Sequence, residues 1–164
     1  MAFEGSYLWR IRQKLGSELV LMPGATVLVE NQQGEVLLVR RTDTSEWCVP
    51  AGAAEVGDSF AKTAINELKE EAGLTVEERD LVPFGCLSDP GIHTVKYPNG
   101  DITHCFAMCF AVRSWSGVPA PDLEEMSDLA FFNPAELPIP MYRPAVKVCE
   151  MYEMFKSNGQ FQVS

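Results

Sequence analysis

The chain has 164 residues, the length of one ordinary domain, and its 46% apolar and 22% charged residues are typical of a globular protein. Asp and Glu outnumber Lys and Arg by 23 to 13, which gives a formal net charge of −10. This charge argues against binding to DNA or RNA through their phosphates, and against docking on an anionic membrane. A small anionic substrate fits such a chain where metal ions supply positive charge.

The apolar runs and the cysteines indicate in which cellular compartment the protein is expected. The longest apolar run, Cys105 to Val112, has eight residues, whereas a membrane-spanning helix needs roughly 20. The first residues show no basic stretch followed by an apolar one, so we expect no secretion signal. The five cysteines are an odd number without a Cys-x-x-Cys pair, which indicates free thiols rather than disulfides or a zinc site. We therefore expect a cytoplasmic protein that does not contact the membrane.

The first elements in chain order are a helix and two strands. Apolar spacing predicts a short amphipathic helical extension within residues 5–16. Strands are expected over 19–30 and 35–41, and the turn at 31–34 predicts that they pair as a hairpin. Gly24 follows a proline inside the first strand, where its backbone freedom suits a bulge or a switch between sheets.

The next element is a helix that Ser59 opens as N-cap and that runs to about Ala72, with Gly73 as its stop. The remaining expected elements are a strand over 81–87, a turn over 97–101, a strand buried on both faces over 102–113, a strand over 129–132 and a closing helix from about Pro144. Strands and helices are mixed, so the fold class is α/β or α+β, a single domain over 1–164 with helices flanking a mixed sheet.

Three carboxylates gather on one side of the predicted 59–72 helix. Glu67, Glu70 and Glu71 fall within an arc of about 100° at 3.6 residues per turn. Like charges at this spacing repel one another, and negative charge near a helix C-terminus opposes the helix dipole. A solvated acidic face is the ordinary explanation of such a run. The alternative is that the three carboxylates hold Mg²⁺ or Mn²⁺, because hard oxygen ligands suit these ions.

The loop before this helix favours the second explanation. Together, Gly52, Asp58, Asn66, Glu67, Leu68, Glu70, Glu71, Gly73 and Leu74 follow the spacing of G-x5-E-x7-R-E-U-x-E-E-x-G-U, where U is a bulky aliphatic residue. This segment resembles the box of the Nudix hydrolases, and seven of the nine defined positions match. Trp47-x-x-Pro50 before the box and the Leu-Leu-Val-Arg-Arg run that ends at Arg41 also resemble the family.

Two positions depart from the family pattern. Asp58 replaces a glutamate with a side chain one methylene shorter, and Asn66 replaces the arginine that orients the box carboxylates in the family. Asn66 offers a hydrogen bond but no charge, so we expect altered metal affinity or slower turnover, since such supporting changes often cost about 10- to 100-fold.

The resemblance implies the fold, the cofactor and the catalytic residues. The fold would be an α/β/α sandwich, and the cofactor Mg²⁺ or Mn²⁺. Glu67 and Glu71 would be metal ligands, Glu70 a ligand or the group that activates water, and the backbone carbonyl of Ala51 a further metal contact. The reaction would be cleavage of a diphosphate linkage by attack of water at phosphorus.

Other residues are candidates for the substrate side of the site. Either Arg40 or Arg41 is expected to face the site, where it would hold a phosphate, although pairing with an acid is an equal alternative. Relatives recruit a further acid from a loop before the last strand, and Glu125 is our candidate among four acids there: Asp122, Glu124, Glu125 and Asp128.

The implied substrate is a nucleoside diphosphate derivative such as ADP-ribose or a nucleotide sugar, with nucleoside triphosphates as competitors. Pro90 resembles a marker of ADP-ribose pyrophosphatases and favours the first slightly. The alternative function is a catalytically weakened Nudix-like module that binds nucleotides or regulates. A small-molecule nucleotide is the expected partner, without nucleic acid or membrane, and analogy adds a homodimer.

Overall fold

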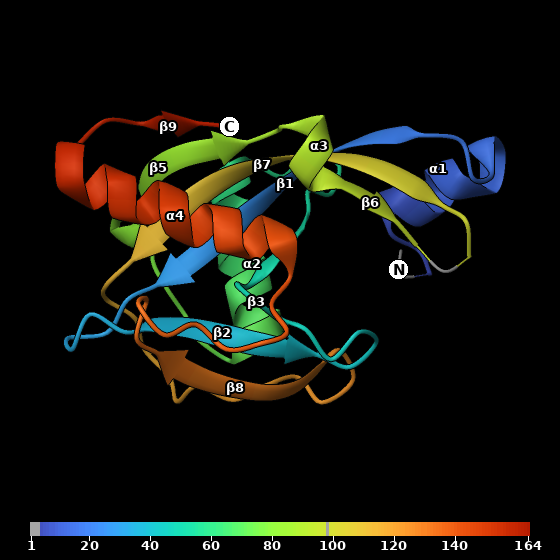
Figure 1. Ribbon diagram of the computed structural model, residues 1–164. Helices are drawn as coiled ribbons and strands as arrows, with labels where there is room; N and C mark the ends of the chain where they lie inside the picture. The colour runs from blue at the N-terminus through green and yellow to red at the C-terminus, as the bar shows by residue number, and fades with distance from the viewer. Residues whose placement is uncertain (1–3, 98) are drawn as a thin grey trace.

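The computed structural model describes residues 4–97 and 99–164, and its elements are labelled in Figure 1. The helices are α1 (Tyr7–Leu15), α2 (Phe60–Ala72), the 3-10 turn η1 (Glu78–Asp80), α3 (Pro90–His93) and α4 (Arg143–Asn158). The strands are β1 (Val20–Val29), β2 (Val36–Arg41), β3 (Trp47–Cys48), β4 (Ala51–Ala53), β5 (Val82–Leu87), β6 (Thr94–Lys96), β7 (Ile102–Val112), β8 (Met126–Phe132) and β9 (Gln162–Val163).

The strands form two sheets. The larger is mixed, with order β4-β1-β7-β5-β9 and β6 paired to β7, and the smaller is the antiparallel sheet β3-β2-β8. In the larger sheet β1 and β7 run parallel along the whole of β1. The predicted strand over 102–113 is therefore central, which explains its apolar residues on both faces.

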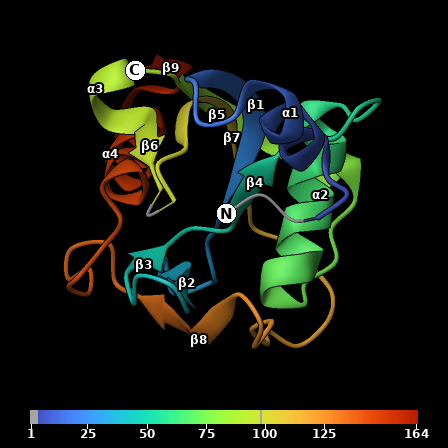
Figure 2. The ribbon, with the colours of Figure 1, turned by 90° about the vertical axis from the view of Figure 1, so that its right-hand side faces the viewer.

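Helices cover both faces of the larger sheet. Figure 2 shows α2 on one side of the β1–β7 pair and α4 on the other, with the β2–β8 layer below. The α2 face that packs inward carries Ala64, Leu68 and Ala72, all without solvent exposure. The predicted mixed sheet with flanking helices is confirmed. No helix of the described residues has the length and apolar character needed to cross a membrane.

The predicted hairpin between the first two strands is wrong. β1 lies in the larger sheet and β2 in the smaller one, and the contact at the turn between them is an isolated bridge from Glu30 to Val36. Both edges of β1 are already occupied, because β7 pairs along one edge while β4 and the carbonyl of Pro50, which accepts from the Val27 N–H at 2.8 Å, line the other. The chain therefore changes sheets at the turn.

Gly24 serves close packing rather than a bulge. The β1–β7 register continues through Gly24 without a shift. A Cβ atom at this position would lie 2.3 Å from the carbonyl oxygen of Gly52 in β4, far inside ordinary contact distance. Only glycine lets β4 approach β1 so closely, and β4 carries the backbone against which the acids of α2 lie.

The ends of α2 agree with the prediction. The Ser59 Oγ accepts a hydrogen bond from the Lys62 N–H at 3.1 Å, and Gly73 ends the helix in the left-handed conformation at φ 68°. The turn expected over 97–101 joins the antiparallel strands β6 and β7, although Pro98 itself lies outside the described residues.

Candidate active site

The strand β4 and the helix α2 meet at Gly52 and Glu67. A Cβ atom built on Gly52 would lie 2.1 Å from the carboxyl carbon of Glu67 and 2.2 and 2.3 Å from its two oxygens. The Glu67 carboxylate thus occupies the space that any other residue at position 52 would fill. The first glycine of the box has a direct physical reason, since it gives this carboxylate its place against the backbone.

Glu71 provides a second link between the same two elements. Its side chain is buried, and its Oε2 accepts a hydrogen bond from the Ala51 N–H at 2.9 Å. The backbone of β4 therefore fixes one carboxylate by contact and the next turn's carboxylate by a hydrogen bond. The role predicted for the Ala51 carbonyl is separate from this contact and stays a prediction.

Burial and mutual repulsion disfavour the charged forms of these acids. Burial, followed by the charges of Glu70 and Glu125, raises the pKa of Glu67 to about 7. Burial and then the charge of Glu67 raise the pKa of Glu71, against the lowering effect of the Ala51 hydrogen bond. Burial and the neighbouring Asp122 also raise the pKa of Glu125.

These acids form no ion pair within the described part of the chain. Within residues 4–97 and 99–164, none of the ion pairs involves Glu67, Glu70, Glu71 or Glu125. Buried carboxylates normally have a partner, because an unpaired buried charge is costly. The structure therefore gathers negative charge in a place where it costs stability, which is typical of a functional site.

Glu125 reaches this cluster from the segment before β8. Its carbonyl accepts hydrogen bonds from the Thr42 N–H at 2.8 Å and the Thr42 Oγ1 at 2.9 Å, which ties this segment to the end of β2. Its charge acts on both Glu67 and Glu71. Among the four acids considered from the sequence, Glu125 is thus the one whose charge acts on the predicted carboxylates of α2. Asp122 meets α2 through its backbone N–H, which donates to the Glu71 carbonyl at 3.4 Å, and Asp128 pairs in register with Arg40 in the sheet.

The two arginines at the end of β2 have different surroundings. Arg40 donates from Nε to the Ser45 carbonyl at 3.1 Å, within its own turn. Arg41 makes a two-point ion pair with Asp43, from Nε at 2.8 Å and Nη2 at 2.7 Å, and its guanidinium lies 5.9 Å from the centre of the Tyr142 ring. Its charge acts on both Glu71 and Glu125, where it partly opposes the rise in pKa that burial causes. Arg41 is therefore the arginine beside the acids.

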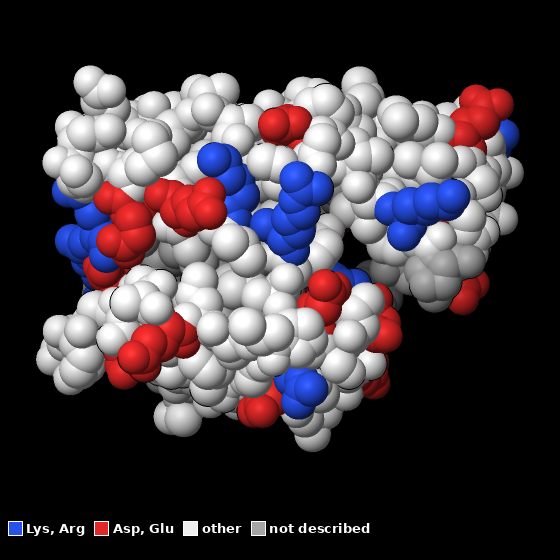
Figure 3. All heavy atoms as spheres, viewed as in Figure 1, with Lys and Arg blue, Asp and Glu red and all other residues white. Residues whose placement is uncertain are grey.

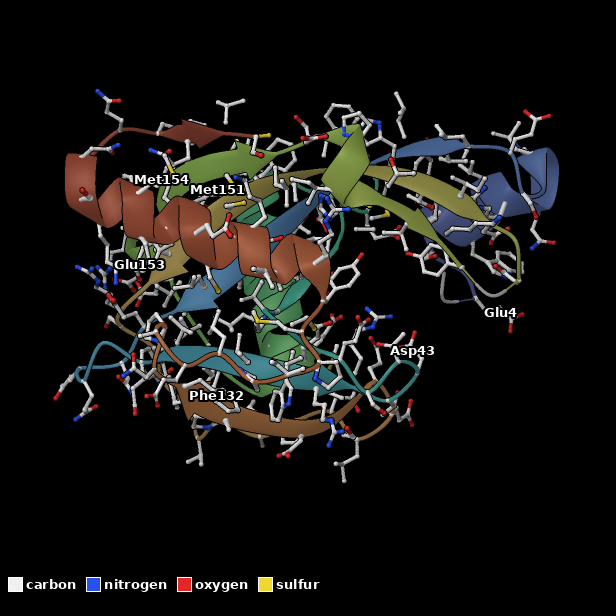
Figure 4. All side chains as sticks on the ribbon, viewed as in Figure 1. Glu4, Asp43, Phe132, Met151, Glu153 and Met154 are labelled. Carbon is white, nitrogen blue, oxygen red and sulfur yellow. The ribbon has the colours of Figure 1, made fainter. Side chains whose placement is uncertain are left out.

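The surface is hollowed near this turn. Figure 3 shows a recess where the end of the molecule that carries α1 and β6 meets the β2–β8 layer. Figure 4 shows Asp43 in the loop at the end of β2, on the same side of the molecule. The ion pair of Asp43 thus belongs to the open side of the structure, in contrast to buried Glu71.

The donor set suits a hard divalent cation. The described residues contain no group of three or more Asp, Glu, His or Cys side chains already arranged around one ion position. Magnesium usually takes only one or two protein carboxylates and completes its shell with water and substrate phosphates, so it does not require such a cage. Half-buried Glu67 and buried Glu71, which form no described ion pair, fit this mode of binding.

The two positions that depart from the box lie at the edge of this arrangement. Asn66 is half-buried on α2, and its side chain makes no hydrogen bond to any residue that the structure describes. Asp58 is half-buried and lies in a groove of about 420 Å³. In the same groove, Glu55 accepts from the Tyr7 N–H at 2.8 and 3.0 Å and lies 3.9 Å from Arg10, so this acid holds α1 to the box loop.

Comparison with known proteins gives the family. The NUDIX domain family model matches residues 20–150, most of the chain. The chain belongs to the NUDIX family. Among curated proteins, it is 40% identical over 50 residues to the "Putative 8-oxo-dGTP diphosphatase" of Bacillus subtilis (strain 168), which covers 30% of this chain and 34% of that protein. It is 39% identical over 59 residues to the "RNA pyrophosphohydrolase" of Sphingopyxis alaskensis, or 35% and 37% of the two chains. The matches span about a third of these relatives.

Solved structures share the fold over a much larger part of the chain. The MutT NUDIX hydrolase from Burkholderia pseudomallei has a TM-score of 0.64 at 19% identity, and the match covers 80% of this chain and 98% of that one. A structure described as "UDP-X diphosphatase" has a TM-score of 0.63 at 16% identity, covering 96% and 73%. At these identities the likeness establishes the architecture alone.

Two residues at the site were not predicted from the sequence. Asp43 and Tyr142 both contact Arg41, but they lie about a hundred positions apart, so no local pattern connects them. In the sequence, the one signal was that Asp43 follows Arg41 by two residues. This spacing is too common to predict an ion pair.

Proposed function

We propose that the chain is a divalent-metal-dependent pyrophosphohydrolase that cleaves a phosphoanhydride bond of a small nucleotide by attack of water at phosphorus. One observation carries the proposal: Glu67 and Glu71 lie against the β4 backbone, and neither forms an ion pair with any residue that the structure describes. Such a cluster favours a bound cation over an empty state, because a cation removes the repulsion between the carboxylates. Membership in the NUDIX family agrees with this activity.

The proposed roles follow from the surroundings of each side chain. Glu67 and Glu71, with the Ala51 carbonyl, hold Mg²⁺ or Mn²⁺. When bound, such an ion offsets phosphate charge and makes water a better nucleophile. Glu70 accepts the proton of the attacking water, whose oxygen bonds to phosphorus as the anhydride P–O bond breaks and its electrons pass to the leaving phosphate. Arg41 contacts a phosphate oxygen, and Glu125 completes the acidic side of the site.

The substrate is proposed as a nucleoside diphosphate derivative, with ADP-ribose and nucleotide sugars placed first. The names of similar proteins support both this class and its competitor, since they include "UDP-X diphosphatase" as well as "Putative 8-oxo-dGTP diphosphatase". A chain with net charge −10 repels a long polyanion more than a small one, so a 5′-triphosphate RNA is placed last.

The test is a substrate panel with added Mg²⁺ or Mn²⁺. It contains ADP-ribose, UDP-glucose, the nucleoside triphosphates, 8-oxo-dGTP and a 5′-triphosphate RNA oligonucleotide, with phosphate and nucleotide products measured by chromatography. We expect metal-dependent cleavage of at least one small nucleotide. Glu70→Gln and Glu71→Gln should each lower kcat by about 10²- to 10⁴-fold, which is the usual contribution of a proton-transfer group to the rate. Glu78→Gln, an exposed acid outside the site, is the matched control.

Two outcomes would contradict the proposal in different ways. Saturable nucleotide binding without any metal-dependent product would show the weakened binding module that Asn66 and Asp58 leave as the alternative. Cleavage at the normal rate by both glutamine variants would place catalysis elsewhere in the molecule.

A further inference from the structure

The pairing of Arg41 is unexpected for its electrostatic surroundings. The positive charge of Arg41 acts on two of the acids that form no described ion pair, Glu71 and Glu125. The backbone brings Arg41 to them, because it pairs in register with Met126 of β8, the residue after Glu125. Coulomb attraction between two charges is stronger where the dielectric is lower, although burial of both charges also costs desolvation. Glu71 is only 6% exposed, whereas the Asp43 side chain is 50% exposed. The guanidinium nevertheless pairs with the more exposed acid.

The turn after β2 explains this choice. The Arg41 N–H donates to the Glu46 carbonyl at 3.0 Å, and the Ser45 N–H donates back to the Arg41 carbonyl at 3.1 Å. Ser45 has a φ of 60°, a left-handed conformation that is uncommon for residues other than glycine. This closed turn places the Asp43 carboxylate alongside the guanidinium, where both oxygens accept from the side of its fork.

We infer that Asp43 is a positioning residue that holds Arg41 away from Glu71 and Glu125, so that these carboxylates remain free for a divalent cation. Asp43 occupies Nε and Nη2, while the Tyr142 ring lies beside the guanidinium. The Nη1 group is left to meet a substrate phosphate. Without Asp43, Arg41 pairs with the carboxylates and competes with the cation for them. This inference rests on the proposed metal-dependent function.

The test measures metal binding rather than turnover. Mn²⁺ is titrated into metal-free protein, and free Mn²⁺ is followed by its electron paramagnetic resonance signal. Asp43→Ala should weaken Mn²⁺ binding by about 10- to 100-fold, the range found when a residue that supports metal ligands is removed. The double variant Asp43→Ala with Arg41→Gln should regain the affinity of Arg41→Gln alone, because the competing charge is gone. Asp43→Glu, which keeps the carboxylate, should retain most of the affinity.

The control is Glu77→Gln. Glu77 and Arg79 form an exposed ion pair at the same two-residue spacing, with Nη2 and Oε2 2.9 Å apart. This variant should bind Mn²⁺ as the unaltered protein does, and thermal unfolding should show that every variant is folded.

Each contrary result has one meaning. Equal Mn²⁺ affinity in Asp43→Ala and in the control overturns the inference. A loss that persists in the double variant also overturns it, since Asp43 then acts without Arg41. Absence of Mn²⁺ binding in the unaltered protein instead refutes the proposed metal-dependent function.

Discussion

The contact between Gly52 and Glu67 allows a strong effect on activity to be predicted from a single methyl group. In Gly52→Ala the new Cβ would lie 2.1 Å from the Glu67 carboxyl carbon, whereas carbon atoms in contact are separated by about 3.5–4.0 Å. The carboxylate must therefore move by at least about 1.4 Å, which follows from the difference between these distances. Its position at the end of a flexible side chain makes that movement easy.

The variant should separate activity from stability. A displacement of about 1 Å in a catalytic arrangement costs about 10²-fold in rate, so kcat with Mg²⁺ should fall by about 100-fold. The free energy of unfolding should change by less than the roughly 1–3 kcal/mol of an overpacked core, because the side chain escapes toward solvent.

Steady-state kinetics and thermal unfolding measure the two effects. Gly91→Ala is the control, since a Cβ there meets only the Asp89 Oδ1 at 3.2 Å. Normal kcat and normal Mn²⁺ affinity in Gly52→Ala would refute the placement of Glu67 at the site. A large loss of stability would show instead that the substitution disturbs the β4 backbone.

Three further predictions concern neighbouring features. The pKa of Glu67 is raised in the folded protein to about 7, so its contribution to the stability of metal-free protein is full below the unfolded pKa and is lost as pH rises through about 7. Glu67→Gln should therefore flatten the dependence of Tm on pH between about 5 and 8. An unchanged slope would contradict this expectation. Asn66→Arg restores a charge beside the box acids and should raise kcat/KM by up to about 10-fold; a decrease would show that the local packing needs asparagine. Glu55→Ala removes the carboxylate that accepts from the Tyr7 N–H at the start of α1 and should cost about 1 kcal/mol, measured by denaturant unfolding. Cleavage by protease near Gly16 should increase as a second readout.

The sequence alone determined the elements whose signals are local. Ser59 and Gly73 mark the two ends of α2 because capping depends on the residues at the helix ends themselves. The spacing of Glu67, Glu70 and Glu71 placed three carboxylates on one side of that helix for the same reason. The box spacing, with the departures at positions 58 and 66, was sufficient to indicate the family that the comparison with known proteins gives.

Strand pairing was not determined in this way. A turn between two apolar strands predicts a hairpin, yet β1 and β2 lie in different sheets because both edges of β1 are occupied by segments distant in the sequence. The sequence predicted backbone freedom at Gly24 for a bulge or a change of sheet, whereas the structure requires glycine there because Gly52, in a strand not predicted from the sequence, lies so close.

In the candidate site, too, some features follow from the local sequence and others from the tertiary structure. Local periodicity predicts which acids share a helix face, whereas burial, neighbouring charges and ion-pair partners depend on segments that meet only in the folded chain. Tertiary structure therefore decided that Glu125 joins the acids of α2, that Arg41 rather than Arg40 lies beside them, and that Asp43 holds this arginine. The physical reason is that electrostatic interactions depend on distance and dielectric in space, and neither quantity is encoded in the spacing of residues along the chain.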